Sequence, residues 1–271
     1  MARRIVICAD DYGLAPGVSR AIRELALAGR LNATSVMTVF PDLETEAEAL
    51  LQVGEATGFG IGLHLTLTGG FAPLIAAPMG DGPLPGLRDL IVQAYLRRLD
   101  LAAVEDEIEA QFSAFSALFG RPPSHVDGHQ HAHVLPGIRP IVLAATRRHA
   151  PAAWVRDSSP SGGVAEGLDL KGKLIGAFSA GLRRDAAAAG LKANAGFAGA
   201  YSFNDANAFQ AVLARALTHL PDGGAVMVHP GHVDAVLAAR DPVTAQREAE
   251  FQVLAGKEFG KLLESKAISL R

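Results

Sequence analysis

The sequence is poor in cysteine and in long apolar runs, and it has no surplus of basic charge. Cys8 is the only cysteine among 271 residues, which excludes an intrachain disulfide and a cluster of several thiolates around zinc. The formal net charge of −3 offers no basic surface for nucleic acid or an anionic membrane. No apolar run approaches the roughly 20 residues that span a bilayer. Any metal site must therefore use nitrogen and oxygen ligands.

The N-terminal segment is typical of a first strand and not of an export signal. Arg3 and Arg4 precede a short apolar run over residues 5–9, which Asp10 and Asp11 end at once. A secretory signal has a longer apolar region. We therefore expect a cytoplasmic protein with no transmembrane segment and no nucleic-acid partner. Because no repeat or interdomain linker interrupts the chain, residues 1–271 are expected to form one domain.

Strand-like and helix-like segments alternate along the chain. Apolar runs rich in β-branched residues are typical of strands buried in a parallel sheet, and the segments between them carry apolar residues at helical spacing. This alternation predicts an α/β fold with about seven mostly parallel strands, for which a barrel suits slightly better than an open sheet. The predicted helices include 43–57, 101–119, 138–149, 170–189, 205–219 and 243–263.

Two stretches rich in glycine and proline interrupt this alternation, at residues 69–88 and 157–168. Long loops in a compact domain are often lids or substrate-binding segments, but a surface excursion with no role is an equally good interpretation. The same loops offer a way to cover the site of a neighbouring subunit in a homodimer. The sequence leaves these alternatives open.

Reactive side chains follow five predicted strands, at the point where each strand ends. Asp10 and Asp11 follow the first strand, His64 ends another, and the remaining ends carry the segment 125–133 with its four histidines, then Arg156 and His229. The carboxyl ends of barrel strands form one face, where (β/α) barrels assemble their active sites. We therefore expect these side chains to share one site.

An aspartate and two histidines form a ligand set with open positions, which suits a hydrolytic metal. Adjacent carboxylates at a strand end point in different directions, so one of Asp10 and Asp11 can bind a cation while the other handles a proton. Spacing within the histidine segment favours His125 or His129 as the third ligand over His131 and His133, and it does not choose between the first two.

Two further residues have local surroundings that suggest a role. His64 shares a strand face with Gly62 and Thr66, and these small or polar neighbours predict an open site around it. His229 follows a strand and precedes a rigid Pro-Gly turn that would fix its direction. We interpret His229 as a candidate general acid.

These motifs resemble, in order and spacing, those of the YdjC-like carbohydrate deacetylases. The resemblance extends from Arg4 to the last predicted helix, although residues 157–200 contain no motif that can be placed. Tyr12 is a small departure, because phenylalanine usually follows the two aspartates in the family. The matching segments are ADDYG at 9–13, GLHLTLT at 62–68, HVDGHQHAH at 125–133 and HPG at 229–231.

The resemblance implies a NodB-like distorted (β/α) barrel and metal-dependent removal of acetyl groups from N-acetylated sugars, either chito-oligosaccharide-like or hopanoid-linked. It implies that Asp11, His64 and His129 hold one divalent ion. Two histidines and an aspartate suit Zn²⁺, whereas Mg²⁺ is often assigned to this family. Asp10 is then the general base and His229 the acid. Further residues expected to touch substrate or orient the ligands are Tyr12, Thr66, His125, Asp127, His131, His133 and Arg156.

Two other functions compete with this hypothesis. One is a different metal-dependent hydrolase, an amidohydrolase or phosphoesterase that uses two ions. The motif order disfavours it, because a His-x-His pair belongs to the first strand of amidohydrolases, and here that strand ends in Asp10 and Asp11. The other is a catalytically silent sugar-binding protein, which the retention of every candidate catalytic residue argues against.

Overall fold

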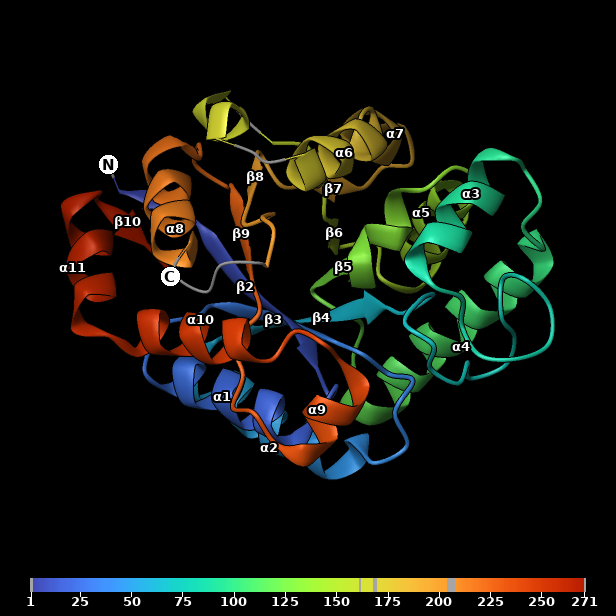
Figure 1. The fold of residues 1–271 in the computed structure, drawn as a ribbon, viewed down its shortest axis with the longest axis horizontal. Helices are drawn as coiled ribbons and strands as arrows, with labels where there is room; N and C mark the ends of the chain where they lie inside the picture. Colours follow the sequence, from blue (N-terminus) through green and yellow to red (C-terminus); the bar gives the residue numbers. More distant parts are fainter. Residues whose placement is uncertain (1, 161, 168–169, 204–207, 271) are drawn as a thin grey trace.

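A curled sheet of eight parallel strands forms a half-barrel at the centre of the protein, in the order β7-β6-β5-β4-β3-β2-β9-β8 (Figure 1). The computed structural model describes residues 2–160, 162–167, 170–203 and 208–270. A separate parallel pair, β1 (Arg3–Arg4) and β10 (Ile268–Ser269), joins the two ends of the chain. The eight strands are β2 (Val6–Tyr12), β3 (Ala33–Val36), β4 (Gly60–Leu65), β5 (His125–Gly128), β6 (Trp154–Val155), β7 (Lys192–Ala193), β8 (Phe197–Ala198) and β9 (Ala225–Val228).

The two edges of the sheet are neighbours in the chain. β7 and β8 stand at opposite ends of the strand order, yet only residues 194–196 separate them. The Asn194 side chain bridges this gap, since its Nδ2 donates to the backbone oxygens of Asp157 and Gly196. The sheet must therefore curl until its edges approach each other, which confirms the predicted distorted barrel.

Helices cover the outside of the curled sheet. In Figure 1, α1 and α2 lie below it, α4 and α5 on the right, α6 and α7 above, and α8, α10 and α11 on the left. Their bounds are α1 (Pro16–Leu27), α2 (Leu43–Thr57), α3 (Leu87–Tyr95), α4 (Leu101–Phe119), α5 (Ile138–His149), α6 (Leu170–Ser179), α7 (Leu182–Ala188), α8 (Ala208–His219), α9 (Ala235–Arg240), α10 (Ala245–Ala255) and α11 (Lys257–Ser265). Among the described residues, no helix is both long and apolar enough to cross a membrane.

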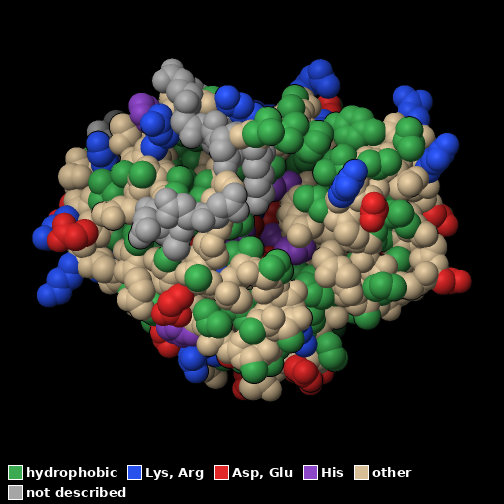
Figure 2. Space-filling view, viewed as in Figure 1, with side chains coloured by type: hydrophobic (Ala, Val, Ile, Leu, Met, Phe, Trp, Pro, Cys, Tyr) green, Lys and Arg blue, Asp and Glu red, His purple; other side chains and the backbone are tan. Residues whose placement is uncertain are grey.

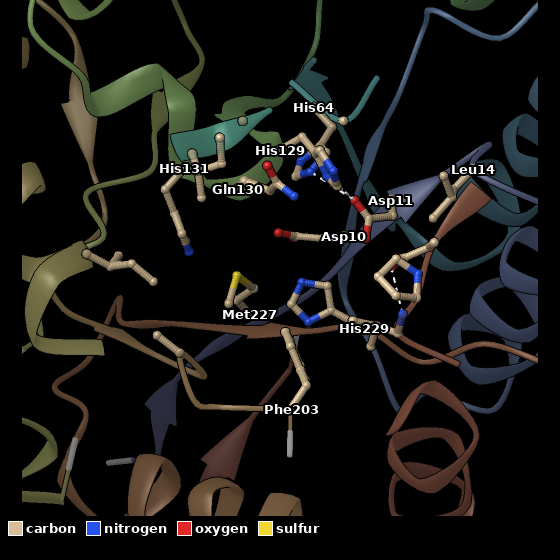
Figure 3. A pocket seen from close by; sticks show the side chains of 18 of the residues that line it. Asp10, Asp11, Leu14, His64, His129, Gln130, His131, Phe203, Met227 and His229 are labelled. Atoms are coloured by element: carbon tan, nitrogen blue, oxygen red, sulfur yellow. Dashed lines mark hydrogen bonds and ion pairs between the residues drawn. The ribbon is translucent and has the colours of Figure 1, made fainter. Parts of the chain in front are cut away.

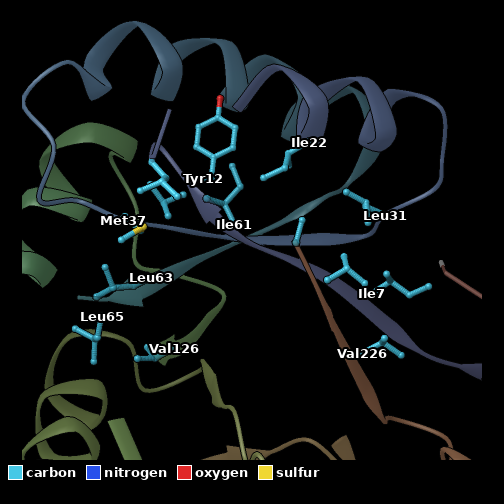
Figure 4. Close-up of a cluster of buried hydrophobic side chains, with 14 of the residues drawn as sticks. Ile7, Tyr12, Ile22, Leu31, Met37, Ile61, Leu63, Leu65, Val126 and Val226 are labelled. Atoms are coloured by element: carbon cyan, nitrogen blue, oxygen red, sulfur yellow. The ribbon is translucent and has the colours of Figure 1, made fainter. Parts of the chain in front are cut away.

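Strand alternation separates the hydrophobic core from the interior of the half-barrel. On β4, Ile61, Leu63 and Leu65 belong to the main hydrophobic cluster against the helices (Figure 4), whereas Gly62 and His64 face the interior. Each fully buried leucine or isoleucine contributes roughly 1.5–3 kcal/mol. The apolar outer faces thus stabilise the fold, and the inner faces are free to carry polar side chains.

Two predicted long helices are each broken at a glycine. The predicted helix 170–189 divides into α6 and α7, and Gly181 between them adopts a φ of +87°. The predicted helix 243–263 divides into α10 and α11 at Gly256, whose extended backbone cannot continue a helix. Apolar periodicity continued across both breaks, so it did not reveal them. The predicted start of a helix at Asp205 lies outside the described residues.

The long loop after β4 is attached firmly to α4. Glu107, which is fully buried, accepts hydrogen bonds from the backbone N–H groups of Leu74, Ile75 and Ala76 at 2.8–3.2 Å. One turn further along α4, Gln111 bonds the backbone of Thr66 in both directions. These contacts fix the path of the loop beside the carboxyl end of β4.

Candidate active site and metal centre

A cavity of about 670 Å³ opens at the carboxyl ends of the strands. Figure 2 shows histidine side chains at the bottom of this hollow, beside a region of hydrophobic side chains. The cavity has the size of a small-molecule site. Its polar lining includes Asp10, Asp11, His64, His129, Gln130, His131, His229, Arg240, Asp241 and Arg247.

Asp10 and Asp11 both reach the cavity although they are adjacent in β2. Regular alternation would send them to opposite faces, but Asp11 adopts a left-handed φ of 67°, and the pairing register between β2 and β3 shifts between Ala9 and Tyr12. A non-glycine residue in this region stores roughly 1–3 kcal/mol of strain. The irregular strand end thus directs two neighbouring carboxylates into one site.

Asp11, His64 and His129 form a compact group of possible ligands. Asp11 Oδ1 lies 3.2 Å from His64 Nε2 and 2.9 Å from His129 Nδ1 (Figure 3). One donor atom of each residue lies within 4.8 Å of the others. Two imidazoles and a carboxylate suit a first-row transition metal with open positions. The three residues predicted as ligands are therefore brought together in a geometry that fits one ion.

Asp127 supports this group from behind. Its Oδ1 lies 2.6 Å from His64 Nδ1, which directs the other ring nitrogen of His64 towards Asp11. Burial alone would lower the pKa of His64, but Asp127 and then Asp10 outweigh burial and raise that pKa to about 10. The negative potential that favours protonation of His64 also favours binding of a metal cation beside it.

Arg156 holds Asp10 by two hydrogen bonds. Its Nη1 and Nη2 donate to the two carboxylate oxygens of Asp10 at 2.5 and 2.6 Å, and Nη2 also forms an ion pair with Asp127 at 2.5 Å. Burial raises the pKa of Asp10 above its usual value even though Arg156 lowers it. Asp10 is thus a fixed carboxylate with enhanced basicity beside the Asp11 group. Asp10, His64 and Asp127 also lie close enough to hold a cation, but both oxygens of Asp10 are already bonded to Arg156.

His229 lies across the cavity from His64 and His129 (Figure 3). Its ring meets Phe203 edge-on with centroids 5.2 Å apart, and its backbone N–H donates to Glu250 Oε2 at 2.5 Å. Glu250 is fully buried and also accepts a hydrogen bond from Tyr201 at 2.7 Å. Burial raises the pKa of Glu250 to about 7, although these two donors lower it.

We expect Glu250→Gln to change how stability depends on pH. Between pH 4.5, the ordinary pKa of this carboxyl, and about 7, the unfolded chain releases the proton that the folded protein keeps. Stability contributed by the wild-type side chain therefore falls as pH rises through this window, by roughly 3 kcal/mol in all. In urea unfolding from pH 4 to 8, the variant should lack this decline, whereas Glu248→Gln on the same helix should keep it. Parallel curves for wild type and Glu250→Gln would contradict the prediction.

His125 lies deeper in the half-barrel than the Asp11 group. Its ring stacks on Trp154 with centroids 4.6 Å apart, and its Nε2 lies 3.3 Å from Cys8 Sγ. Burial lowers the pKa of His125 to about 4. A Cβ on Gly62 would lie 2.4 Å from the His125 ring, so the space beside Gly62 is filled by His125. The open site that we expected around His64 from its small neighbour Gly62 is therefore not found there. Although Cys8, His125 and Asp127 lie close enough to hold a cation, Asp127 already pairs with His64 and Arg156.

The remaining predicted residues lie in different surroundings. His131 lines the cavity with its Nδ1 2.9 Å from Ser158 Oγ, and His133 is buried behind the site with Nε2 2.9 Å from the Arg156 backbone oxygen. Thr66 is buried and donates to the His64 backbone oxygen. Of these, only His131 belongs to the cavity wall.

Tyr12 does not reach the cavity, contrary to the expectation that it touches substrate or the ligands. The irregular end of β2 that brings Asp11 inward turns Tyr12 outward, into the layer between sheet and helices (Figure 4). Its hydroxyl donates to the Glu46 backbone oxygen at 2.6 Å and accepts from Arg23 at 2.7 Å. Tyr12 is therefore a residue of the hydrophobic core.

Sequence reasoning missed Arg247 and Glu250, two charged residues of α10. They lie on its buried face together with Leu254, where apolar side chains are usual, and each contacts a site residue. Their spacing of three residues places them on one helical face. Two charged residues at core positions of an amphipathic helix could have marked Arg247 and Glu250 as unusual. The sequence did not indicate which residues they contact, because those residues are far away along the chain.

One wall of the cavity is apolar. Phe71 from the loop after β4 and Ile91 from α3 contribute to it, as do Leu170, Leu174 and Phe178 from α6. Leu170 and Leu174 remain 74% and 48% exposed. The rings of Tyr95 in α3 and Phe178 contact each other in a tilted arrangement with centroids 5.7 Å apart, which connects the two helices. Hydrophobic side chains thus continue from the cavity to the surface around α6 and α3 (Figure 2).

Comparison with known proteins gives three findings. The sequence model of a family described as YdjC-like protein matches residues 4–265. A chitooligosaccharide deacetylase of Yersinia pestis (strain Pestoides F) is 37% identical over 150 residues, or 54% of this chain and 57% of the relative, so the match spans little more than half of either protein. A crystal structure from Enterococcus faecalis V583, whose description proposes cellobiose-phosphate cleavage, has the same fold, with a TM-score of 0.75 and 20% identity over 100% of this chain and 97% of that chain.

Proposed function

Because the chain belongs to the YdjC-like protein family, we propose that it is a metal-dependent carbohydrate deacetylase that hydrolyses the acetamido group of an N-acetylated sugar. The observation that carries the proposal is the Asp11, His64 and His129 group, which lies beside a separate, buried carboxylate at Asp10 in one cavity. The name of the Yersinia relative, chitooligosaccharide deacetylase, points to the same reaction.

Asp11 Oδ1, His64 Nε2 and His129 Nδ1 would hold one divalent ion, Zn²⁺ or Mg²⁺. Two imidazole nitrogens and one carboxylate oxygen favour Zn²⁺ on ligand preference. Such an ion supplies Lewis acidity, which makes an amide carbonyl easier to attack and water easier to deprotonate. His129 fits this role better than His125, because only His129 is within 3 Å of Asp11.

Asp10 acts as the general base in this proposal. It accepts the proton of the water whose oxygen attacks the acetyl carbon, and its raised pKa makes it a better acceptor than an ordinary aspartate. Arg156 keeps the carboxylate in one orientation through two hydrogen bonds. Asp127 orients His64, while His131 and Gln130 line the part of the cavity open to substrate.

His229 acts as the general acid. When the carbon–nitrogen bond of the tetrahedral intermediate breaks, the leaving amine needs a proton, which the imidazolium of His229 donates. The products are acetate and a free amino sugar. Phe203 and the hydrogen bond from the His229 backbone to Glu250 restrict the position of this residue opposite the two histidine ligands.

The apolar wall narrows the choice of substrate. A chito-oligosaccharide presents hydroxyl groups, for which Leu170, Leu174 and Ile91 offer no hydrogen bonds. An amino sugar joined to a large apolar group, such as a hopanoid, would bury these side chains at about 25 cal/mol per Å² of apolar surface. We therefore favour an N-acetylated amino sugar with an apolar aglycone.

Acetate release from a substrate panel tests the function. We expect release from octyl N-acetylglucosaminide at a higher kcat/KM than from N,N′-diacetylchitobiose, loss of release after chelation, and recovery with Zn²⁺ or Mg²⁺. A ratio of two ions per active protein would favour a different metal hydrolase. Absence of release from every acetylated sugar with either ion would contradict the deacetylase proposal.

Leu174→Glu tests the role of the apolar wall within the same panel. Losing the contact of one leucine side chain and adding a charge should lower kcat/KM for the octyl glycoside by about 10- to 100-fold. The rate with diacetylchitobiose should change little. Leu27→Glu, at a side chain that is 61% exposed on α1 and outside the cavity lining, is the matched control. Equal losses with both substrates would rule out an apolar aglycone site.

A further inference from the structure

Asp11 divides its two oxygens between different partners. Oδ1 faces His64 and His129, whereas Oδ2 accepts a hydrogen bond from Arg247 Nη2 at 2.6 Å. Both Asp11 and Arg247 are only 2% exposed, so solvent screens this ion pair weakly. The half of the carboxylate that points away from the ligand group is therefore already engaged.

Arg247, in the first turn of α10, is itself held in place by the segment between α9 and α10. The same Nη2 donates to Asp241 Oδ2 at 2.5 Å, and Nε donates to the Val243 backbone oxygen at 3.2 Å. One guanidinium thus lies between two carboxylates, and the three charged groups carry a net charge of −1. Without the guanidinium, Asp11 would be a buried carboxylate with no fixed counter-charge from α10.

From this arrangement we infer that Arg247 is a positioning residue for the proposed metal ligand Asp11. It occupies Oδ2, leaves only Oδ1 for a cation, and so keeps coordination positions open for water and substrate. Its charge also lowers the affinity of the site for a cation, because it repels the ion and stabilises the metal-free protein. The inference rests on the proposed metal-dependent function.

Removing the charge of Arg247 and removing the charge of Asp241 should have opposite effects on the affinity for a cation. Arg247→Met removes a positive charge and leaves Asp11 to be neutralised by the cation alone, so Zn²⁺ should bind at least about tenfold more tightly. Asp241→Asn removes a negative charge, and Arg247 then has Asp11 as its one carboxylate partner of the two, so Zn²⁺ should bind more weakly. Arg247→Lys keeps the charge and should stay close to wild type. A residue that only supported the fold would weaken binding in every variant.

The experiment is calorimetric titration of the metal-free full-length proteins with Zn²⁺, together with visible spectra of their Co²⁺ forms. We expect an altered Co²⁺ spectrum in Arg247→Met, because Oδ2 becomes available to the ion. Arg139→Met is the matched control, since Arg139 also bonds a carboxylate and several backbone oxygens but does not itself line the cavity. It should bind Zn²⁺ like wild type.

Unchanged or weaker Zn²⁺ binding in a folded Arg247→Met protein would overturn the inference, as would shifts of the same sign in Arg247→Met and Asp241→Asn. If Arg247→Met does not fold, Asp241→Asn decides alone, and unchanged affinity in that variant overturns the inference. A wild-type protein that binds no Zn²⁺, Co²⁺ or Mg²⁺ would instead count against the proposed function.

Discussion

Asp10→Asn is expected to lower acetate release at saturating substrate by about 10²- to 10⁴-fold. The amide has nearly the shape of the carboxylate and can still accept a hydrogen bond from Arg156, but it does not take up the proton of the attacking water. Asp10 is not a member of the Asp11, His64 and His129 group, so Zn²⁺ should still bind, although more weakly than to wild type because one nearby negative charge is lost. Loss of turnover with retained binding would identify a base and not a ligand.

The measurement pairs initial rates of acetate release with calorimetric Zn²⁺ titration of the same preparation. Asp157→Asn is the matched control, because Asp157 is also a buried aspartate that pairs with an arginine, Arg183, but it does not line the cavity. It should keep near-normal turnover. If Asp10→Asn retained more than a tenth of the wild-type rate, the proton would have to go to another group.

Arg156→Met is expected to cost about 3–5 kcal/mol of the free energy of unfolding at pH 7 in the metal-free protein. The guanidinium is fully buried between Asp10 and Asp127, and its removal leaves two carboxylates without their shared counter-ion. The pKa of each carboxyl would then rise in the folded state. The deficit should therefore be smaller at pH 4, where protonation neutralises these groups, than at pH 7.

Urea unfolding at both pH values measures this effect. Adding Asp10→Asn to Arg156→Met should recover part of the loss, since one of the two uncompensated charges is gone, and such non-additivity is the signature of a coupled pair. Arg148→Met removes an arginine whose side chain is 56% exposed in its pair with Glu109, and should change stability by no more than about 1 kcal/mol. A pH-independent deficit for Arg156→Met would indicate lost packing instead.

Most of the architecture follows from local patterns that the sequence displays directly. The helix over residues 101–119 begins where Asp100 accepts hydrogen bonds from two backbone N–H groups and ends at Gly120 with a φ of +62°. Such signals depend on neighbours within a few residues. Where the outcome depended on packing elsewhere in the chain, as at Gly181 and Gly256, periodicity predicted one helix instead of two.

The site was predictable to the extent that strand ends meet at one face. Strand alternation placed His64 on one face with Gly62, as the structure has it, but it failed at Asp11. There a left-handed residue reversed the faces of the following chain and took Tyr12 away from the cavity. Arg247 contacts Asp11 across 236 positions of sequence, and no local pattern reports a contact of that range. Spacing alone likewise left His125 and His129 equivalent. The family resemblance favoured His129, and in the structure His129 lies beside Asp11 whereas His125 lies deeper.

The stacked pair of His125 and Trp154 gives the protein a single built-in optical probe. Trp154 is the only tryptophan of the chain, so its emission arises from one place, at the level of Cys8 and below the ligand group. Fluorescence excited at the red edge of the absorption band will therefore report only on the surroundings of Trp154, which we call the floor of the half-barrel. Comparing it with a signal from the whole backbone, such as circular dichroism, distinguishes opening of the floor from global unfolding.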